Sequence, residues 1–356
     1  MAVDPGLLKS LYPLESLRPE HLEALAREAV EELVPRDAVL FSAGDTDELT
    51  LYLLSGEVRG DYPDGRSKSQ SGGVGSLQGR YAVGDLQPRR FTATVVSENA
   101  RIAKLDRRFL EKVMAWDQVV KSGQVKHFDK NPEGNRWVFR LLQSKALRKL
   151  PVANVERLFT RFEEVTAKNG QTVIKEGDVG DYFYVLKEGA AAVSQLLDGG
   201  PSVVAYLVRG DSFGEDALLS NNVRNATVTM MKDGRLMRLS KSDFGELLKQ
   251  PVVDWLSPGK ASILVRQGAG IIDVRTKEEY DERAIKGAVN MPLMRLREHA
   301  NELEKTRKYI AYCNTGERSA AAAFVLSKLG FEAFALQGGL SAMVKQMEQK
   351  KTSEPS

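Results

Sequence analysis

Residues 39–60 read VLFSAGDTDELTLYLLSGEVRG, and residues 173–193 read VIKEGDVGDYFYVLKEGAAAV. In each stretch two glycines stand 12 positions apart, Gly44 and Gly56 in the first and Gly177 and Gly189 in the second. Acidic residues follow the first glycine, and a β-prone apolar run follows them. Glycines beside such runs are typical of tight turns between short strands. The first two thirds of the chain are therefore predicted to contain a structural repeat.

Helical patterns flank the strands of both copies. Residues 19–34 carry apolar side chains at helical spacing, and residues 137–147 and 152–162 do the same ahead of the second copy. Residues 198–200, DGG, lie between two apolar runs and predict a hairpin turn. Each copy is thus predicted to be a small antiparallel β-roll, a jelly-roll-like barrel with flanking helices.

The repeat and a later change of pattern predict the domain organisation. The first β-roll domain is expected over residues 10–118 and the second over 136–250, joined by a polar linker over 119–135. A third domain is expected over residues 253–346, followed by a disordered tail over 347–356. A chain of 356 residues has room for two to three domains, which fits this division.

Charge and composition exclude several classes of protein. Lys and Arg total 51 against 48 Asp and Glu, and the net charge of +3 argues against a surface built to neutralise nucleic-acid phosphates. Three scattered histidines and one cysteine do not make a zinc site, so no metal is expected. A single cysteine also forbids an intrachain disulfide. Because the sequence has no signal-peptide pattern and no apolar run of ~18 residues, we expect a soluble cytoplasmic protein without membrane insertion.

Residues 210–228 read GDSFGEDALLSNNVRNATV and combine the elements of a site for a small organic phosphate. A glycine turn leads into a short helical stretch that begins at Glu215, and Arg224 follows nine positions later. Backbone N–H groups at the start of such a stretch and the planar guanidinium of an arginine both suit an anion. Glu215 is an acceptor suited to a sugar hydroxyl. A Glu–Arg ion pair on an ordinary loop is the alternative interpretation.

This segment resembles the phosphate-binding cassette of cyclic nucleotide-binding domains, such as those of protein kinase A regulatory subunits and the catabolite activator protein. The resemblance covers both repeats, residues 10–250. It implies that Arg224 pairs with the cyclic phosphate and that Glu215 accepts a hydrogen bond from the ribose 2′-OH. It also implies that the phosphate end of the site is completed by Gly214, Ala217, Leu218 and Ala226.

The base preference depends on the residue after the arginine. In cGMP-selective members of the family a threonine there offers its hydroxyl to guanine, whereas this chain has Asn225. An asparagine side chain can also hydrogen-bond a base, so cAMP is the favoured ligand and cGMP stays open. Asp216 stands where the family usually has an apolar residue, and we expect its side chain to face solvent.

The first copy lacks part of this cassette. Aligning Gly84 with Gly210 and Ala93 with Ala226 leaves 9 positions in the first copy against 16 in the second. The missing residues include the glutamate and the short helix. In this alignment Phe91 takes the place of the arginine, with two arginines close by. We therefore expect the first copy to have lost ligand binding and to serve a structural or dimerisation role.

The last third of the chain alternates between strands and helices. Residues 270–274 (GIIDV), 308–312 (KYIAY) and 331–336 (FEAFAL) resemble strands, whereas residues 318–329 are helical and Gly330 suits the end of that helix. Such alternation predicts a small α/β domain with a parallel sheet.

The lone cysteine lies at a position that favours its thiolate. Cys313 follows the strand at 308–312 and precedes a helix, at the sheet edge where parallel sheets bind ligands. A loop there presents successive N–H groups as an anion-binding nest, and Arg318 adds a positive charge. Both effects favour the nucleophilic thiolate. A small buried hydrophobic residue is the alternative interpretation.

The surroundings of Cys313 resemble the rhodanese family. The segments IIDVRTKEEY, KGAVNMP, YCNTGERSAAAA and LQGGLSAM occur in the family's order over residues 253–346. The resemblance implies that Cys313 takes a sulfane sulfur from a small donor as a persulfide, with Arg318 beside it, and passes it to an external thiol acceptor or to cyanide. The loop that would cradle the persulfide consists of Asn314, Thr315, Gly316, Glu317 and Ser319.

Together these features predict a cyclic nucleotide receptor with a sulfurtransferase output domain. Cyclic nucleotide is expected as a regulatory ligand, and no cofactor is expected. The short join after residue 250 leaves no room for DNA-binding helices, so nucleic acid is not an expected partner, whereas a homodimer or a protein partner stays open. Residues 252–256, with Trp255, are hypothesised to close over the nucleotide. The alternatives are a non-catalytic scaffold that docks through its rhodanese fold and a constitutive sulfurtransferase with structural nucleotide domains.

Overall fold

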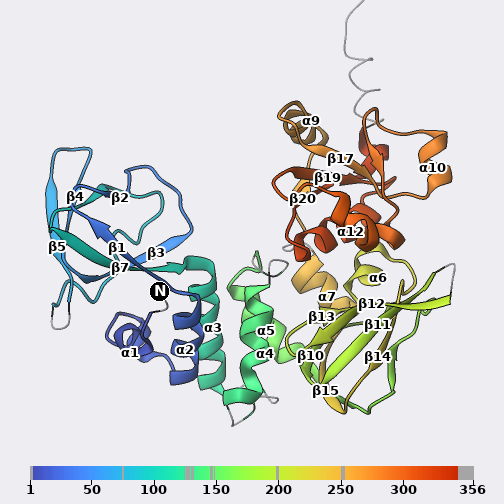
Figure 1. Cartoon of the computed structure of the whole chain (residues 1–356), viewed down its shortest axis with the longest axis horizontal. Coiled ribbons are helices and arrows are strands. Elements are labelled where there is room, and N and C mark those ends of the chain that lie inside the picture. The colour runs from blue at the N-terminus through green and yellow to red at the C-terminus, as the bar shows by residue number, and fades with distance from the viewer. Residues whose placement is uncertain are drawn as a thin grey trace, which may run out of the picture. The chain divides into compact units, whose positions relative to one another are not determined.

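The computed structural model divides the chain into two compact units, residues 1–125 and 126–356 (Figure 1). The structure describes residues 3–73, 76–123, 125, 129, 132–144, 147, 149–197, 200–249 and 253–343. The predicted tail and residues 124, 126–128 and 130–131 of the predicted linker lie outside the described residues. Within the described part of the chain, no helix has the length and apolar character needed to cross a membrane.

The first unit consists of two antiparallel sheets with helices beside them. One sheet has the order β1 (Val30–Pro35), β7 (Asn99–Asp106), β3 (Leu49–Ser55), and the other has the order β2 (Val39–Phe41), β6 (Thr92–Val95), β4 (Glu57–Asp61), β5 (Ser67–Ser71). The helical segments are α1 (Pro5–Leu8), η1 (Leu14–Ser16), α2 (Pro19–Glu28) and α3 (Arg107–Ser122). Buried apolar side chains of both sheets, such as Leu53 and Val58, meet in one core.

The helix predicted over residues 19–34 is shorter than expected. It ends at Glu28, and Val30–Pro35 forms strand β1, which pairs with β7 over six residue positions. Val30, Val34 and Pro35 are poorly suited to the interior of a helix. In strand β1 the backbone groups of this segment instead form hydrogen bonds with β7. The first part of the predicted linker is helical instead, because α3 continues to Ser122.

The second unit begins with a second pair of antiparallel sheets. Their orders are β13 (Ser212–Phe213), β10 (Tyr182–Glu188), β15 (Gly234–Ser240), β8 (Glu163–Ala167), and β12 (Gly200–Val208), β11 (Ala190–Leu197), β14 (Thr227–Met230), β9 (Thr172–Ile174). The helical segments are η2 (Pro132–Asn135), α4 (Arg136–Gln143), α5 (Ala153–Arg161), α6 (Glu215–Ser220), α7 (Lys241–Phe244) and the π-helical turn η3 (Gly245–Lys249). The predicted repeat of β-rolls with flanking helices is confirmed, although the described strands form paired sheets and not one closed barrel.

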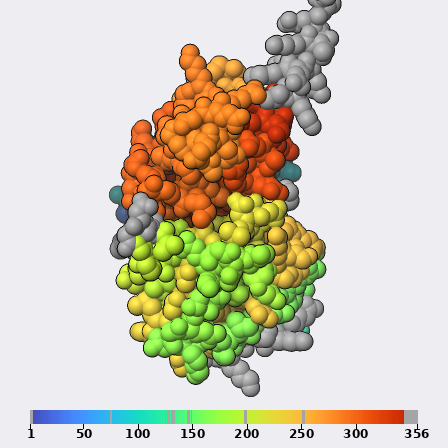
Figure 2. Space-filling view, turned by 90° about the vertical axis from the view of Figure 1, so that its right-hand side faces the viewer, coloured from blue at the N-terminus to red at the C-terminus, as the bar shows by residue number. Residues whose placement is uncertain are grey.

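The last third of the chain forms the predicted parallel sheet. Its order is β16 (Trp255–Leu256), β20 (Glu332–Leu336), β19 (Lys308–Tyr312), β17 (Gly270–Asp273), β18 (Val289–Asn290). The helical segments are α9 (Pro258–Arg266), α10 (Lys277–Glu282), η4 (Leu293–Arg295), α11 (Leu296–His299), η5 (Ala300–Glu302) and α12 (Glu317–Lys328). Helix α12 contacts β19 and β20 and also α6 of the second β-roll, and its residues 319–326 are buried. Figure 2 shows this α/β part packed directly against the second β-roll.

The repeated glycines play the same two roles in both copies. The first glycine of each pair has a positive φ and open space around it, at Gly44 and Gly177. The second also has a positive φ but lies against backbone: a Cβ on Gly56 would be 2.6 Å from the Asn99 carbonyl oxygen, and one on Gly189 would be 3.1 Å from the Gly234 Cα. The second glycine is therefore required by close approach as well as by conformation.

This difference predicts unequal effects of two alanine substitutions. Gly44→Ala should lower the free energy of unfolding by about 1–2 kcal/mol, the range for a non-glycine residue in a left-handed conformation. Gly56→Ala should cost about 1–3 kcal/mol more, because its Cβ overlaps neighbouring backbone. Urea unfolding of both variants measures the difference, and equal losses would contradict the packing role of Gly56.

Candidate functional site

Arg224 is buried three residues before β14, and two carbonyl groups and a carboxylate hold its guanidinium in place. Nη1 donates to the Gly214 carbonyl oxygen at 2.6 Å, and Nη2 donates to that of Tyr182 at 2.7 Å and to Asp181 Oδ1 at 3.0 Å. These bonds use three of the five N–H donors of the guanidinium. The two remaining donors, on Nε and Nη1, have no hydrogen-bond partner among the described residues, and Arg224 lines a cavity.

Glu215 is the first residue of α6 and is 1% exposed. Its Oε1 accepts a hydrogen bond from Lys328 Nζ at 2.8 Å, whereas its Oε2 has no hydrogen-bond partner among the described residues. A buried carboxylate oxygen without a donor is unfavourable by about 1–3 kcal/mol. Such an oxygen fits a site that receives a donor from a ligand. Gly214, just before it, has φ +86°, and a Cβ there would be 2.8 Å from Arg224 Nη1.

A cavity of about 90 Å³ joins these groups. Strands β11 and β12 form one wall, and Arg297 and Lys328 from the α/β part form another. The cassette residues predicted from the sequence that line the cavity are Gly214, Glu215, Ala217, Arg224, Asn225 and Ala226. Leu218 is buried within α6 but does not line it. Trp255 does not line it either, because it lies in strand β16 of the parallel sheet.

The expectation that Asp216 faces solvent is wrong. Asp216 is 8% exposed, and its Oδ2 accepts hydrogen bonds from Arg297 Nη2 and from Asn225 Nδ2, each at 3.2 Å. The α/β part covers this face of α6 and supplies the positive partner. The charged residue thus occurs at an interface that the sequence pattern of the cassette does not reveal.

In the first copy Arg89, and not Phe91, takes the place of Arg224. The same backbone bonds hold both arginines, to Asp45 and Gly44 in the first copy and to Asp178 and Gly177 in the second. The hydroxyls of Thr92 and Thr227 likewise accept from equivalent backbone N–H groups, those of Ala43 and Glu176. The alignment of Phe91 with Arg224 was therefore displaced by two residues, and Phe91 corresponds to Ala226.

Arg89 has no hydrogen-bond donor left for a ligand. Its Nε and Nη2 donate to Asp47, Nη1 donates to the carbonyl oxygens of Val83 and Gly84, and Nη2 also donates to that of Leu49. All five N–H groups are used. The guanidinium also lies 4.3 Å from the ring centroid of Phe41. Because only five positions separate Gly84 from Arg89, against ten between Gly214 and Arg224, the first copy has no counterpart of α6.

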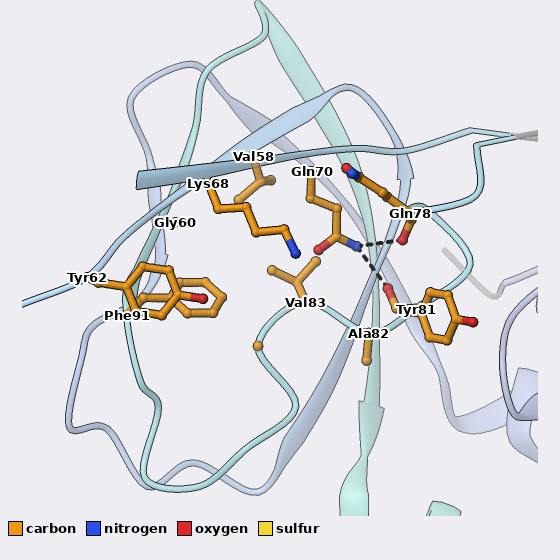
Figure 3. Close-up of a pocket in the computed structure, with 11 residues that line it drawn as sticks. Val58, Gly60, Tyr62, Lys68, Gln70, Gln78, Tyr81, Ala82, Val83 and Phe91 are labelled. Atoms are coloured by element: carbon orange, nitrogen blue, oxygen red, sulfur yellow. Dashed lines mark hydrogen bonds between the residues drawn. The ribbon is translucent and has the colours of Figure 1, made fainter. Parts of the chain in front are cut away.

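The first copy retains a cavity of about 270 Å³ with a different lining (Figure 3). The rings of Tyr62 and Phe91 lie together at one end, with centroids 5.1 Å apart. Gln70 donates to the carbonyl oxygens of Gln78 and Tyr81 at the other end. An aromatic wall therefore stands where the second copy has the small Ala226. This lining and the fully bonded Arg89 fit the expected loss of nucleotide binding.

Cys313 lies just beyond the carboxyl end of β19, and its Sγ is enclosed by the following loop. The residue is 1% exposed. The Gly316 N–H donates to Sγ at 3.1 Å, and the Ser319 Oγ lies 3.8 Å from it. Gly316 has φ +104° and caps α12, so the turn that directs its N–H at the sulfur depends on glycine. Backbone N–H groups placed in this way stabilise a thiolate.

Comparisons with known proteins match two segments of the chain. Residues 164–251 match the family model described as "Cyclic nucleotide-binding domain", and residues 257–346 match "Rhodanese-like domain". The chain joins a cyclic nucleotide-binding domain to a rhodanese-like domain. Curated proteins similar to part of the chain include regulatory subunits of cAMP-dependent protein kinase.

The relatives cover only part of the chain. That of Eremothecium gossypii is 33% identical over 232 residues, 64% of this chain and 45% of the relative. That of Mucor circinelloides f. lusitanicus is 38% identical over 110 residues, 31% of this chain and 26% of the relative. Among solved structures, the regulatory domain of Toxoplasma gondii PKA with cAMP is 20% identical, with a TM-score of 0.30, and the match covers 74% of this chain and 94% of that one. The chain thus spans less than half the length of these curated relatives.

An ion-pair network in the rhodanese-like domain engages residues that the sequence assigned to the persulfide cradle. Arg318 Nη1 and Nη2 donate to the two carboxylate oxygens of Glu279 at 2.6 and 2.8 Å. Asn314 Nδ2 donates to Glu279 Oε1 at 2.8 Å, and its Oδ1 accepts from Arg275 at 3.1 Å. Arg318 therefore shapes the loop through Glu279, and its charge is already paired.

Two further residues that were predicted to cradle the persulfide, Thr315 and Glu317, face solvent or another domain. Thr315 is exposed at the tip of the loop. Glu317 begins α12, and its Oε1 accepts a hydrogen bond from Asn221 Nδ2 of the nucleotide domain at 2.9 Å. Glu279 was not predicted from the sequence, although it lies in the IIDVRTKEEY segment that carries the family resemblance. Arg297 and Lys328 were not predicted either, because no local motif marks them.

The ion pair between Glu279 and Arg318 predicts how the free energy of unfolding depends on pH. Hydrogen bonds from Arg318 lower its pKa from 4.5 to about 2 in the folded protein. A depressed carboxylate pKa stabilises the fold above the unfolded-state pKa, and this contribution disappears as the pH falls through the folded-state pKa. Glu279→Gln should therefore lower the free energy of unfolding at pH 7, and the deficit should shrink between pH 4.5 and about 2.

Urea unfolding at a series of pH values measures this deficit. Glu282→Gln, an exposed residue of the same helix, is the matched control and should show little loss at any pH. A deficit for Glu279→Gln that stays constant down to pH 2 would show that the lost stability does not come from its charge.

Proposed function

We propose that the chain is a receptor for a cyclic nucleotide, with cAMP favoured over cGMP, and that its rhodanese-like domain transfers sulfane sulfur through Cys313. The single observation that carries the receptor assignment is the pairing of two unsatisfied groups at one cavity. Among the residues that the structure describes, Glu215 Oε2 is a buried acceptor without a donor, and two N–H donors of Arg224 have no acceptor. A cyclic nucleotide offers a ribose hydroxyl to the first and an anionic phosphate to the second.

The surroundings of Asn225 favour adenine. Its side-chain Nδ2 donates to Asp216, and its backbone carbonyl oxygen accepts from Gln195 Nε2 at 2.8 Å. With one of its two amide N–H donors engaged by Asp216, Asn225 has less capacity to donate to guanine. The relatives named as cAMP-dependent kinase subunits support the same ligand.

The sulfur-transfer assignment rests on the environment of Cys313. In the first step the thiolate attacks the sulfane sulfur of thiosulfate, the sulfur–sulfur bond of the donor breaks, and sulfite leaves with its electron pair. The product is a cysteine persulfide, whose negative charge the loop N–H groups stabilise. In the second step an acceptor thiolate or cyanide attacks the outer sulfur, and the Cys313 thiolate leaves. Because Cys313 is the only cysteine in the sequence, the acceptor comes from outside the chain.

A non-catalytic scaffold is the second candidate, and one observation favours it. Cys313 is 1% exposed, and the nearby Arg318 is paired with Glu279 and not free for an anionic donor. In that case the nucleotide would regulate docking of a partner to the rhodanese-like fold.

Calorimetric titration with cAMP and cGMP tests the receptor assignment. Arg224→Ala should weaken cAMP binding by about 30-fold or more, because truncating one member of a buried charge pair typically costs 2 kcal/mol or more. Arg89→Ala is the matched control in the first copy and should leave the affinity unchanged, since all donors of Arg89 are used internally. Equal binding by wild type and Arg224→Ala would remove Arg224 from the site.

A thiosulfate–cyanide assay separates enzyme from scaffold. The wild type should form thiocyanate, and Cys313→Ser should abolish this, because a serine hydroxyl cannot form a persulfide. Persistent activity in Cys313→Ser would contradict the nucleophile assignment. An inactive wild type, with and without cAMP, would favour the scaffold.

A further inference from the structure

The rhodanese-like domain reaches into the nucleotide pocket with two cations. Lys328, the last residue of α12, donates to Glu215 Oε1 at 2.8 Å and to the Ser212 carbonyl oxygen at 2.7 Å. Arg297 Nη2 lies 3.2 Å from Asp216 Oδ2 and 3.6 Å from Glu215 Oε1. The carboxylate that would receive the ribose is thus already bound by another domain.

The pocket in this arrangement is too small for a nucleotide. Its volume is about 90 Å³, whereas pockets for ligands of drug size occupy roughly 300–1,000 Å³. The wall formed by β11 and β12 is held by antiparallel backbone pairing along β11, with one β-bulge between Val193 and Ser194. The opposite wall consists of the Arg297 and Lys328 side chains, which belong to a separate domain. The cavity can therefore enlarge most easily if the rhodanese-like domain moves away from it.

We propose that the rhodanese-like domain is a lid on the nucleotide pocket, closed by Lys328 and Arg297, and that a cyclic nucleotide opens it by engaging Glu215. The inference rests on the proposed receptor function and adds its regulation. In the closed state Lys328 neutralises a carboxylate that is 1% exposed. In the open state the ribose hydroxyl donates to Glu215 Oε2, and water replaces the lysine at Oε1. Because coupling between binding events is reciprocal, a ligand that favours the open state loosens the docking of the domain.

Helix α12 connects this lid to the cysteine loop. Its first residue, Glu317, bonds Asn221 at the end of α6, and its last residue, Lys328, bonds Glu215 at the start of α6. The two helices therefore lie side by side and are joined at both ends (Figure 1). The turn at Gly316, which caps α12, also donates to Cys313 Sγ. A rigid helix of 12 residues thus spans from the nucleotide pocket to the sulfur over roughly 18 Å.

The first test is the affinity of full-length Lys328→Gln for cAMP, measured by calorimetry. Removing the lysine charge leaves Glu215 buried without its partner in the closed state, which penalises closure. The variant should bind cAMP more tightly than the wild type, on the order of tenfold, because a larger fraction of the protein is open before binding. Lys308→Gln is the matched control, since Lys308 pairs with Glu332 at the surface of the same domain.

Arg297→Gln provides an independent variant should Lys328→Gln fold poorly. It should also tighten cAMP binding, and Arg295→Gln should not, because Arg295 pairs with Glu298 on its own segment. Unchanged or weaker cAMP binding by both pocket variants would overturn the lid. The absence of cAMP and cGMP binding in every protein, variants included, would instead overturn the receptor function on which the lid rests.

The second test follows the single cysteine. The rate of Cys313 alkylation by iodoacetamide should rise when cAMP is added to the wild type, because opening frees α12 and the loop that encloses Sγ. Lys328→Gln should react faster than the wild type before any nucleotide is added. Wild type that binds cAMP while its alkylation rate stays constant would overturn the connection through α12.

Discussion

The nucleotide pocket and the contact with the rhodanese-like domain both depend on the buried carboxylate of Glu215. An unpaired charge with 1% exposure is strongly unfavourable, so the site needs either a counter-charge or hydrogen-bond donors. Lys328 supplies the counter-charge from the neighbouring domain, and the other carboxylate oxygen has no donor within the described part of the chain. One side chain therefore determines both the chemistry of the pocket and the docking of the domain beside it.

The two β-rolls illustrate how the same backbone position can acquire different chemistry. Arg89 and Arg224 occupy equivalent places, as their matching backbone bonds demonstrate. In the first copy a bidentate bond to Asp47 and several carbonyl groups consume the guanidinium, whereas in the second copy part of it remains free. An arginine in the right place is therefore insufficient for anion binding. The number of donors that the fold leaves unused decides it.

Much of the fold and the site could be predicted because the signals are local. The glycine spacing, the cassette around Arg224 and the loop after Cys313 each depend on neighbouring residues in the chain. The equivalence of Arg89 with Arg224 could not be predicted from the sequence. The shortened loop allows alignments that differ by two residues, and only the backbone hydrogen bonds decide between them. The contacts of Lys328 and Arg297 depend on how two domains pack, which no spacing rule within one domain encodes.

Asp216 provides the strongest indication that the two domains are matched to one another. The family usually has an apolar residue at this position of the cassette, and a buried aspartate there is unfavourable unless it is paired. Here it is paired with Arg297 of the rhodanese-like domain and with Asn225. Apart from its neighbour, the nucleotide domain would keep the Asn225 bond to Asp216 but lose the positive partner that Arg297 supplies. The charge of Asp216 is therefore compensated by the docked rhodanese-like domain, which links this position of the cassette to the packing of the two domains.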